Sequence, residues 1–276
     1  MPIITLTSDY GIVDHRVASI KGTILSLNPE ITIVDITHQI EAFNLKQTAY
    51  IVRNAFRHFP IGTVHIIAVD SFFKKDFRGL IFKVDGHYFI APDNGILKLI
   101  FHDIKPELIH EITFTNRFDD VINFPALDIF APAAVHLCNG GLPEVVGRPF
   151  KKPLDIKFPH SVFNPGENMI VGEVIYIDSF GNIVSNISKQ FFQKYQANTT
   201  KLTIKFRNLA LSHVYNHYSE FVTDWADEPS FHGKSIAIFN DVDLLELCIY
   251  KGSGRNGAKD LYGMKVGENI FVEFQK

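Results

Sequence analysis

The first 70 residues alternate between strand-like and helix-like segments, and this alternation limits the possible folds more than any other feature. Apolar, β-branched runs at residues 3–9, 31–37 and 63–70 predict strands, while residues 15–29 and 45–59 carry apolar side chains at helical spacing. A strand followed by a helix and another strand is typical of a parallel sheet covered by helices. We therefore predict an N-terminal α/β domain with a central, mostly parallel sheet.

The pattern changes further along the chain. Residues 80–96 predict two strands around a turn, and residues 127–140 predict a helix. The later runs 169–178, 200–206, 234–240, 244–250 and 268–275 all read as strands. They predict a smaller all-β domain, most simply an antiparallel barrel-like module.

A proline-rich stretch separates the two patterns. Residues 148–169 contain four prolines and show no periodicity, which is typical of a connecting segment. We expect an α/β domain at 1–150, a linker at 151–168 and the β domain at 169–276.

Charge and composition narrow the function classes. The net charge of −3 gives no basic field, so nucleic-acid binding is disfavoured. The sequence shows neither a signal-peptide pattern nor an apolar run that would span a bilayer, so we expect no membrane association. Cys138 and Cys248 are most simply reduced thiols, and we expect a cytoplasmic protein.

Two acids follow predicted strands. Asp9 ends the first strand and Asp70 ends the third. Ligands of open α/β sheets bind outside the carboxyl ends of the strands, so the two carboxylates indicate a shared crevice. Alternatively, each acid caps the turn that follows it, and the spacing does not decide between the two readings. The positions of these acids and Asp178 give no support for a metal site, and we expect none.

The glycines 252, 254 and 257 have the G-x-G-x-x-G spacing of dinucleotide-binding loops. Such a loop needs to lie between the first strand and helix of a βαβ unit. Here it lies late in the predicted β domain, so a turn is the better interpretation.

The stretch VIYIDSFGNIVSNI, residues 174–187, alternates like a strand but holds Asp, Gly and Asn between positions 178 and 182. These residue types are depleted in sheets, so the segment indicates a site that presents a carboxylate, an aromatic ring and a carboxamide together on a stiff element.

Several motifs in order resemble the S-adenosylmethionine hydroxide adenosyltransferases, the water-using relatives of fluorinating and chlorinating enzymes. They are TLTSDYG, DITHQIEAFNLKQTAYIV, APDNGIL, DIFAPAAVHL and YIDSFGNIVSNI, and the likeness runs from Ile3 to about Phe271. The resemblance implies an α/β domain followed by a β-barrel domain, assembled as a homotrimer with sites at subunit interfaces. It also implies an adenosyl small molecule as the ligand, with no further cofactor.

The resemblance assigns roles to residues of the β domain. Asp178 takes the position that holds the methionine ammonium, Asn182 the position that reads the adenine edge, and Phe180 packs beside them. Asn256, Gly257 and Ala258 match a stretch whose backbone meets adenine.

It assigns further residues in the α/β domain. Asp9 matches an acid that holds the ribose hydroxyls, Phe43 an aromatic residue against the nucleoside, and Asn94 of the APDNGIL motif a substrate-binding position. Asp70 matches the catalytic aspartate. The family reaction is attack of water or hydroxide at the ribose 5′ carbon, which releases methionine and adenosine.

The chain departs from the family pattern around that water. The family arginine falls seven positions after the aspartate, whereas here Arg78 comes one position later. A local bulge would restore it, and a shift of one residue would turn it to the opposite face. Pro125 and Leu127 replace a family histidine and arginine, and Asp241 replaces a serine in the methionine pocket.

Two hypotheses from different classes remain. The first is a slow S-adenosylmethionine hydrolase with Asp70 and Arg78 as its catalytic residues, and it makes the protein an enzyme. The second is a non-catalytic protein that binds S-adenosylmethionine or adenosine. Halide transfer is disfavoured because the Asp70 carboxylate would repel an anionic nucleophile.

Overall fold

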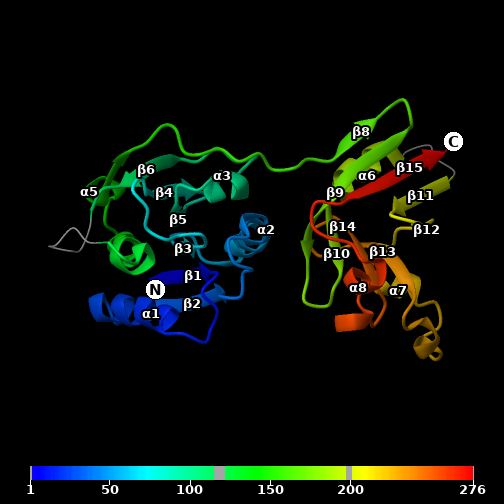
Figure 1. The fold of residues 1–276 in the computed structure, drawn as a ribbon, viewed down its shortest axis with the longest axis horizontal. Helices are drawn as coiled ribbons and strands as arrows, with labels where there is room; N and C mark the ends of the chain where they lie inside the picture. Colours follow the sequence, from blue (N-terminus) through cyan, green and yellow to red (C-terminus); the bar gives the residue numbers. More distant parts are fainter. Residues whose placement is uncertain (1, 115–121, 197–200, 276) are drawn as a thin grey trace. The chain divides into compact units, whose positions relative to one another are not determined.

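A computed structural model describes residues 2–114, 122–196 and 201–275 (Figure 1). The chain divides into two compact units, Met1–Phe158 and Pro159–Lys276. The boundary between them falls inside the proline-rich segment 151–168. Among the described residues, no helix combines the length and the apolar character that crossing a bilayer requires.

The first unit is built on a seven-stranded sheet in its described part. In spatial order its strands are β2 (Thr32–Thr37), β1 (Ile3–Ser8), β3 (Val64–Ala68), β5 (His87–Pro92), β4 (Gly79–Val84), β6 (Leu108–Ile112) and β7 (Gly147–Pro149). Strands β2, β1, β3 and β5 pair in parallel. Strand β4 is antiparallel to both β5 and β6, and β7 is antiparallel to β6. The sheet is therefore mostly parallel, as the sequence predicts.

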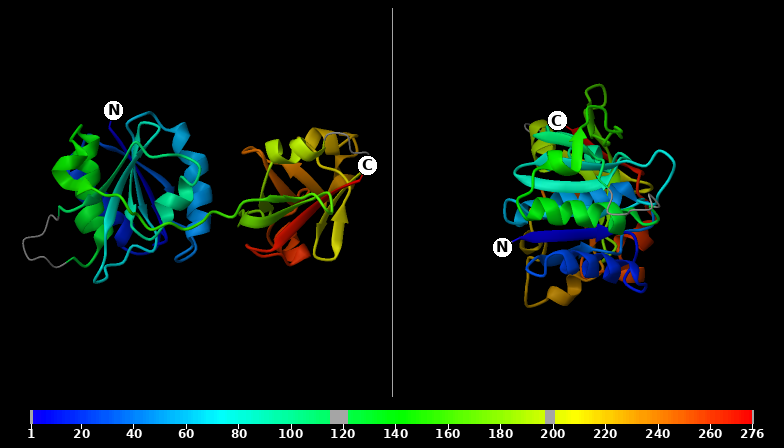
Figure 2. Two further views of the ribbon diagram at one scale, coloured as in Figure 1. Left: turned by 90° about the horizontal axis from the view of Figure 1, so that it is seen from above. Right: turned by 90° about the vertical axis from the view of Figure 1, so that its left-hand side faces the viewer.

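Helices cover both faces of this sheet, and Figure 2 shows them flanking it. On one face, α1 (Arg16–Leu27) and α4 (Ala131–Cys138) pack on the strands through residues such as Ile24 and Ala134. On the other face, α2 (Leu45–Ala55) and α3 (Ile96–Ile100) pack through residues such as Val52. The remaining helical segments are Phe56–His58 (3₁₀), Ala126–Phe130 (π) and α5 (Pro143–Val146).

The second unit is a curled antiparallel sheet around its own core. Its strands, in spatial order, are β12 (Leu209–Leu211), β11 (Lys201–Phe206), β15 (Asn269–Gln275), β9 (Met169–Ile177), β10 (Ile183–Ser188), β14 (Leu244–Ile249) and β13 (Ser235–Phe239), with β8 (Val162–Asn164) beside β9. Helical segments between strands are α6 (Lys189–Gln196), α7 (Tyr218–Phe221), Glu228–Phe231 (3₁₀), Gly254–Asn256 (3₁₀) and α8 (Ala258–Tyr262).

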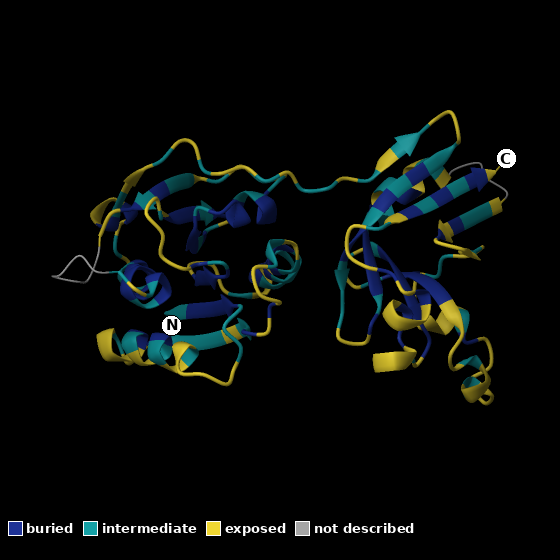
Figure 3. Ribbon diagram, in the orientation of Figure 1, coloured by how far each residue is buried: buried dark blue, intermediate teal, exposed yellow. Residues whose placement is uncertain are grey.

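Alternation along the strands builds this second core. In β15, Ile270, Val272 and Phe274 are buried while the residues between them are less buried, and Figure 3 shows the banding. The buried faces of several strands meet in one cluster that includes Ile183 and Leu245. The barrel-like β domain predicted from the sequence is confirmed.

His65 and His87 are buried next to each other inside the first unit. His65 Nδ1 is 2.7 Å from Thr5 Oγ1, and His65 Nε2 is 3.3 Å from His87 Nδ1. The ring of His65 stacks on Phe89 with centroids 4.7 Å apart. Burial, with a smaller contribution from the nearby His87, lowers the pKa of His65 to about 3. The imidazole is therefore a neutral core residue.

This pair predicts acid sensitivity of the first unit. Because the folded pKa of His65 lies below the unfolded value of about 6.5, the unfolded chain binds the proton first as the pH falls. The contribution of neutral His65 to the free energy of unfolding is complete above pH 6.5. It decreases as the pH falls toward about 3, by at most about 1.4 kcal/mol per pH unit. Urea unfolding at several pH values, followed by circular dichroism, measures how the free energy of unfolding changes with pH. The His65→Gln variant should show a weaker dependence on pH, and an equal dependence in both proteins would contradict the prediction.

Candidate functional site

The Asp9 carboxylate joins three loops at the carboxyl ends of β1, β2 and β3. Its Oδ2 accepts hydrogen bonds from the backbone N–H of Phe43, at 3.1 Å, and of Asp70, at 3.2 Å. Both of these residues have positive φ angles, 66° and 49°, in the left-handed region that side chains rarely adopt. Asp9 therefore holds two unfavourable backbone turns in place.

Asn94 holds the loop that contains Asp70. This buried amide donates to the backbone carbonyls of Val69, at 3.1 Å, and Asp70, at 3.4 Å, while its oxygen accepts from Ile96 N–H at 3.1 Å. Partial burial raises the pKa of the Asp70 carboxyl, and the charge of Asp9 adds to this, while Lys74 and Asn94 oppose it. Asp9, Phe43, Asp70 and Asn94 thus lie together, as one site requires.

Arg78 pairs with a carboxylate other than Asp70. Its Nε donates to Asp93 Oδ2 at 3.0 Å, and its guanidinium lies 5.5 Å from the Phe150 ring centroid. The other Asp93 oxygen accepts from the backbone N–H of Leu154 at 2.8 Å. The preceding residue, Phe77, packs against Phe130 in the core. The one-residue offset therefore puts an aromatic ring into the core and the arginine onto a different carboxylate.

The segment 123–128 begins a helix instead of presenting donors. Asp128 Oδ2 accepts from the backbone N–H of Asn123, at 3.2 Å, and of Phe124, at 3.0 Å. Pro125 stands at the N-terminal cap of the π-helical turn, and Leu127 packs against the core. Neither side chain at 125 or 127 carries a hydrogen-bond donor.

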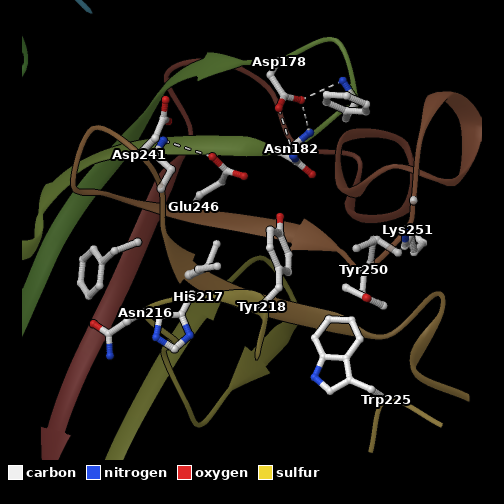
Figure 4. Close-up of a pocket in the computed structure, with 16 residues that line it drawn as sticks. Asp178, Asn182, Asn216, His217, Tyr218, Trp225, Asp241, Glu246, Tyr250 and Lys251 are labelled. Atoms are coloured by element: carbon white, nitrogen blue, oxygen red, sulfur yellow. Dashed lines mark hydrogen bonds between the residues drawn. The ribbon is translucent and has the colours of Figure 1, made fainter. Parts of the chain in front are cut away.

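In the second unit, the residues 178–182 form a tight connection between β9 and β10. Asp178 Oδ1 accepts from the backbone N–H of Phe180, at 2.9 Å, and of Asn182, at 2.8 Å, and Oδ2 accepts from Asn182 Nδ2 at 3.0 Å. Gly181 has a φ angle of 83°, which glycine adopts without strain. The Asp, Gly and Asn that interrupt the strand pattern are therefore turn residues, held by one carboxylate (Figure 4).

Of the predicted residues Asn256, Gly257 and Ala258, Gly257 lies directly against this turn. Lys259 N–H donates to the Gly181 carbonyl at 2.7 Å. A Cβ atom on Gly257 would overlap the Phe180 carbonyl oxygen, so only glycine allows this approach. The G-x-G-x-x-G pattern is a loop between β14 and α8, in keeping with the turn interpretation.

A cavity of about 710 Å³ opens beside the turn, and Figure 4 shows the side chains that surround it. It is lined by four of the residues predicted from the sequence, namely Asp178, Phe180, Asn182 and Asp241. The sequence interpretation missed further lining residues, namely Asn216, His217, Tyr218, Trp225, Ile238, Phe239, Asn240, Glu246, Ile249, Tyr250, Lys251 and Gly252. A volume of this size accommodates a metabolite.

Glu246 is the most unusual of the missed residues. It lies on β14 and is only 7% exposed, and its Oε2 accepts from Asn240 Nδ2 at 3.1 Å. Burial raises the pKa of its carboxyl to about 7; the Asn240 bond opposes the rise, while the charges of Asp178 and Asp241 add to it. A glutamate inside an otherwise apolar strand is a signal that sequence reasoning had available.

Aromatic side chains form another part of the wall. Tyr218, Trp225 and Tyr250 all line the cavity, and the Tyr218 hydroxyl lies 3.8 Å from Cys248 Sγ. Burial raises the pKa of the Tyr218 hydroxyl and of the Cys248 thiol, so both remain protonated at neutral pH. Tyr218 and Trp225 come from the connection between β12 and β13, where no periodicity marked them.

The described residues contain no cluster of three or more His, Cys, Asp or Glu that would hold a metal ion. The chemistry of both groups of residues is that of carboxylates, amides and aromatic rings.

The close packing at Gly257 gives a stability prediction. Gly257→Ala should destabilise the second unit by about 1–3 kcal/mol, because backbone atoms on both sides must move. Gly166→Ala is the matched control, since its Cβ would meet only Asn164 Oδ1 at 3.4 Å, and we expect a change within about 0.5 kcal/mol. Trp225, the single tryptophan, reports unfolding of this unit by fluorescence. Similar midpoints for both variants would refute the packing argument.

Both units match domain models of one known protein family. A model of the S-adenosylmethionine hydroxide adenosyltransferase N-terminal domain matches residues 4–147, and a model of the C-terminal domain matches residues 172–271.

Curated relatives include several enzymes named (R)-S-adenosyl-L-methionine hydrolase. The one from Methanocaldococcus jannaschii is 28% identical over 214 residues, 75% of each chain, and the one from Thermus thermophilus is 23% identical over 269 residues, 94% of this chain and 95% of the relative. A fluorinase from Actinopolyspora mzabensis is 27% identical over 220 residues, covering 68% of this chain and 72% of the relative.

Solved structures share the fold. A conserved protein from Thermotoga maritima superposes with a TM-score of 0.84 at 26% identity, over 98% of this chain and 99% of that chain. A Thermus thermophilus protein gives a TM-score of 0.73 at 24% identity, over 99% of this chain and 100% of that chain.

Proposed function

Because the chain belongs to the S-adenosylmethionine hydroxide adenosyltransferase family, we propose that it hydrolyses S-adenosylmethionine to adenosine and methionine. Relatives named (R)-S-adenosyl-L-methionine hydrolase support this activity. The observation that carries the proposal is the Asp9 carboxylate, which holds Phe43 and Asp70 in strained turns at one edge of the sheet. Strained backbone of this kind is concentrated at functional sites.

The reaction itself needs few groups. The oxygen of a water molecule attacks the ribose 5′ carbon, a C–O bond forms, and the C–S bond breaks with its electron pair moving to sulfur. Sulfur leaves as a neutral thioether, so no acid is required for the leaving group and no cofactor is needed. The water loses a proton, and Asp70 is the proposed acceptor, because partial burial raises its pKa above that of an ordinary aspartate.

The remaining roles follow from the positions of the side chains. Asp9 offers a carboxylate for the two ribose hydroxyls, and the Phe43 ring, 64% exposed, offers an apolar surface for the nucleoside. In the second unit, Asp178 is the proposed partner of the ligand ammonium, and Asn182 the proposed reader of adenine. The proposal includes a cytoplasmic homotrimer, the assembly that the resemblance implies.

We expect turnover to be slow. Arg78 is engaged by Asp93, and Pro125 and Leu127 provide no donors, so the attacking water lacks positioned cationic and imidazole partners. Losing such groups commonly lowers rates by about 10²–10⁴.

Incubation of the purified chain with S-adenosylmethionine, followed by chromatography of adenosine, tests the proposal. Asp70→Asn should reduce adenosine release at least about 10²-fold, because an amide accepts no proton. Asp76→Asn is the matched control, an exposed acid on the same loop, and should leave the rate unchanged. Adenosine release no greater than that of Asp70→Asn would refute hydrolysis.

The raised pKa of Asp70 predicts a pH profile. The carboxylate is the active form, so kcat/KM should fall as the pH drops through its pKa, at a pH above the value near 3.9 of an ordinary aspartate. Rates measured from pH 8 to pH 4 locate this limb. The residual activity of Asp70→Asn should lack it, and a limb that persists in the variant would assign the base to another group.

The Arg78–Asp93 pair also favours a second candidate, a protein that binds an adenosyl ligand without turnover. Titration calorimetry with S-adenosylmethionine and with adenosine separates the two functions. Binding without adenosine release supports the second candidate, and absence of binding removes it.

A further inference from the structure

We infer that the cavity of the second unit selects an adenosyl sulfonium whose side chain ends in an amine and carries no carboxylate. The inference rests on the proposed function, because it names the substrate class for the same site. It follows from the charges around the cavity, the burial of Glu246 and the aromatic wall.

The first observation is the excess of acids. Asp178, Asp241 and Glu246 all line the cavity, and the first two are close enough to raise the pKa of the third. Glu246 is buried, and one of its oxygens is directed into the space between Asp178 and Tyr218 while the other holds Asn240 (Figure 4). A buried carboxylate facing a cavity calls for a cationic partner.

The second observation concerns the basic residues among the described lining. His217 is held by Ser219, with its Nδ1 2.8 Å from the hydroxyl, and by Glu220 at 3.7 Å. Lys251 is exposed and lies on the side of Tyr250 and Trp225, away from Asp241 (Figure 4). The pKa of Glu228 is lowered mainly by the hydrogen bond from the Tyr250 side chain, and the charge of Lys251 contributes to this. Neither basic group is placed to neutralise a ligand carboxylate at the acidic end.

The third step is covalent geometry. In methionine, the ammonium and the carboxylate are bonded to the same carbon, so a site that receives one also receives the other. Placing the ammonium among three acids brings the ligand carboxylate next to like charges, which partial burial makes more costly. A propylamine tail keeps the cation and removes the anion.

The aromatic wall fits the same ligand. Tyr218, Trp225 and Tyr250 present rings to the cavity, and ring faces attract ammonium and sulfonium cations. A ligand with two cationic centres and no anion is therefore complementary to both the acidic residues and the aromatic rings that line the cavity.

The test compares S-adenosylmethionine with its decarboxylated form, S-adenosyl-3-methylthiopropylamine, using the full-length chain. Hydrolysis of the latter gives adenosine, 3-methylthiopropylamine and one proton. Calorimetry gives Kd and chromatography of adenosine gives kcat/KM for each compound. We expect the amine to bind at least about tenfold more tightly.

Asp241→Asn removes one acid at an exposed position and should bring the two affinities together by about threefold or more. Glu246→Gln, which keeps the bond with Asn240, should act in the same direction. Asp227→Asn, an exposed acid that does not line the cavity, is the matched control and should leave the ratio unchanged.

Equal or tighter binding of S-adenosylmethionine would overturn the inference, even if adenosine is released and the proposed function stands. Preferential binding of the amine without release of adenosine from either compound would support the inference and refute hydrolysis. A preference that survives Asp241→Asn and Glu246→Gln unchanged would show that these acids do not set it, and would overturn it as well.

Discussion

The hydrogen bonds from Phe43 and Asp70 to the Asp9 carboxylate are the interaction on which the first unit's site depends. Parallel strands bring their carboxyl ends to one edge, but the loops that leave them need fixed turns. Left-handed backbone at a phenylalanine and an aspartate costs on the order of 1 kcal/mol each, and one carboxylate oxygen satisfies both backbone donors. The acid that sequence reasoning assigned to a ligand is therefore also a structural residue, and Asp178 has the same double character in the second unit.

This double use has a physical reason. A carboxylate that accepts backbone N–H bonds is fixed in direction, so such an acceptor is already oriented before a ligand arrives. Asp178 Oδ1 uses both of its lone-pair sites for the turn, whereas Oδ2 accepts one bond and keeps a second site. The turn therefore leaves one acceptor site of the carboxylate for the proposed contact with a ligand.

The sequence was most informative where local chemistry determines structure. Strand and helix periodicity predicted both units, and the family resemblance was confirmed. The strand ends indicated Asp9 and Asp70 without deciding between a shared crevice and two separate caps. The Asp, Gly and Asn at 178–182 were recognised as unusual for a strand, but the turn that they form was not predicted. The direction of Arg78 was not predictable, because Asp93, Phe150 and Leu154 reach it only through the tertiary fold.

Glu246 and the changes near Asp70 affect two different properties, the rate of the reaction and the choice of ligand. Near the proposed base Asp70, Pro125 begins a helix without a side-chain donor and Arg78 pairs with Asp93. Around the ligand tail, an acid has been added at Asp241 beside the buried Glu246. Weaker stabilisation of a nucleophile lowers rate without changing affinity, whereas added negative charge changes which cations bind. The proposed slow turnover and the proposed ligand preference therefore have separate physical causes.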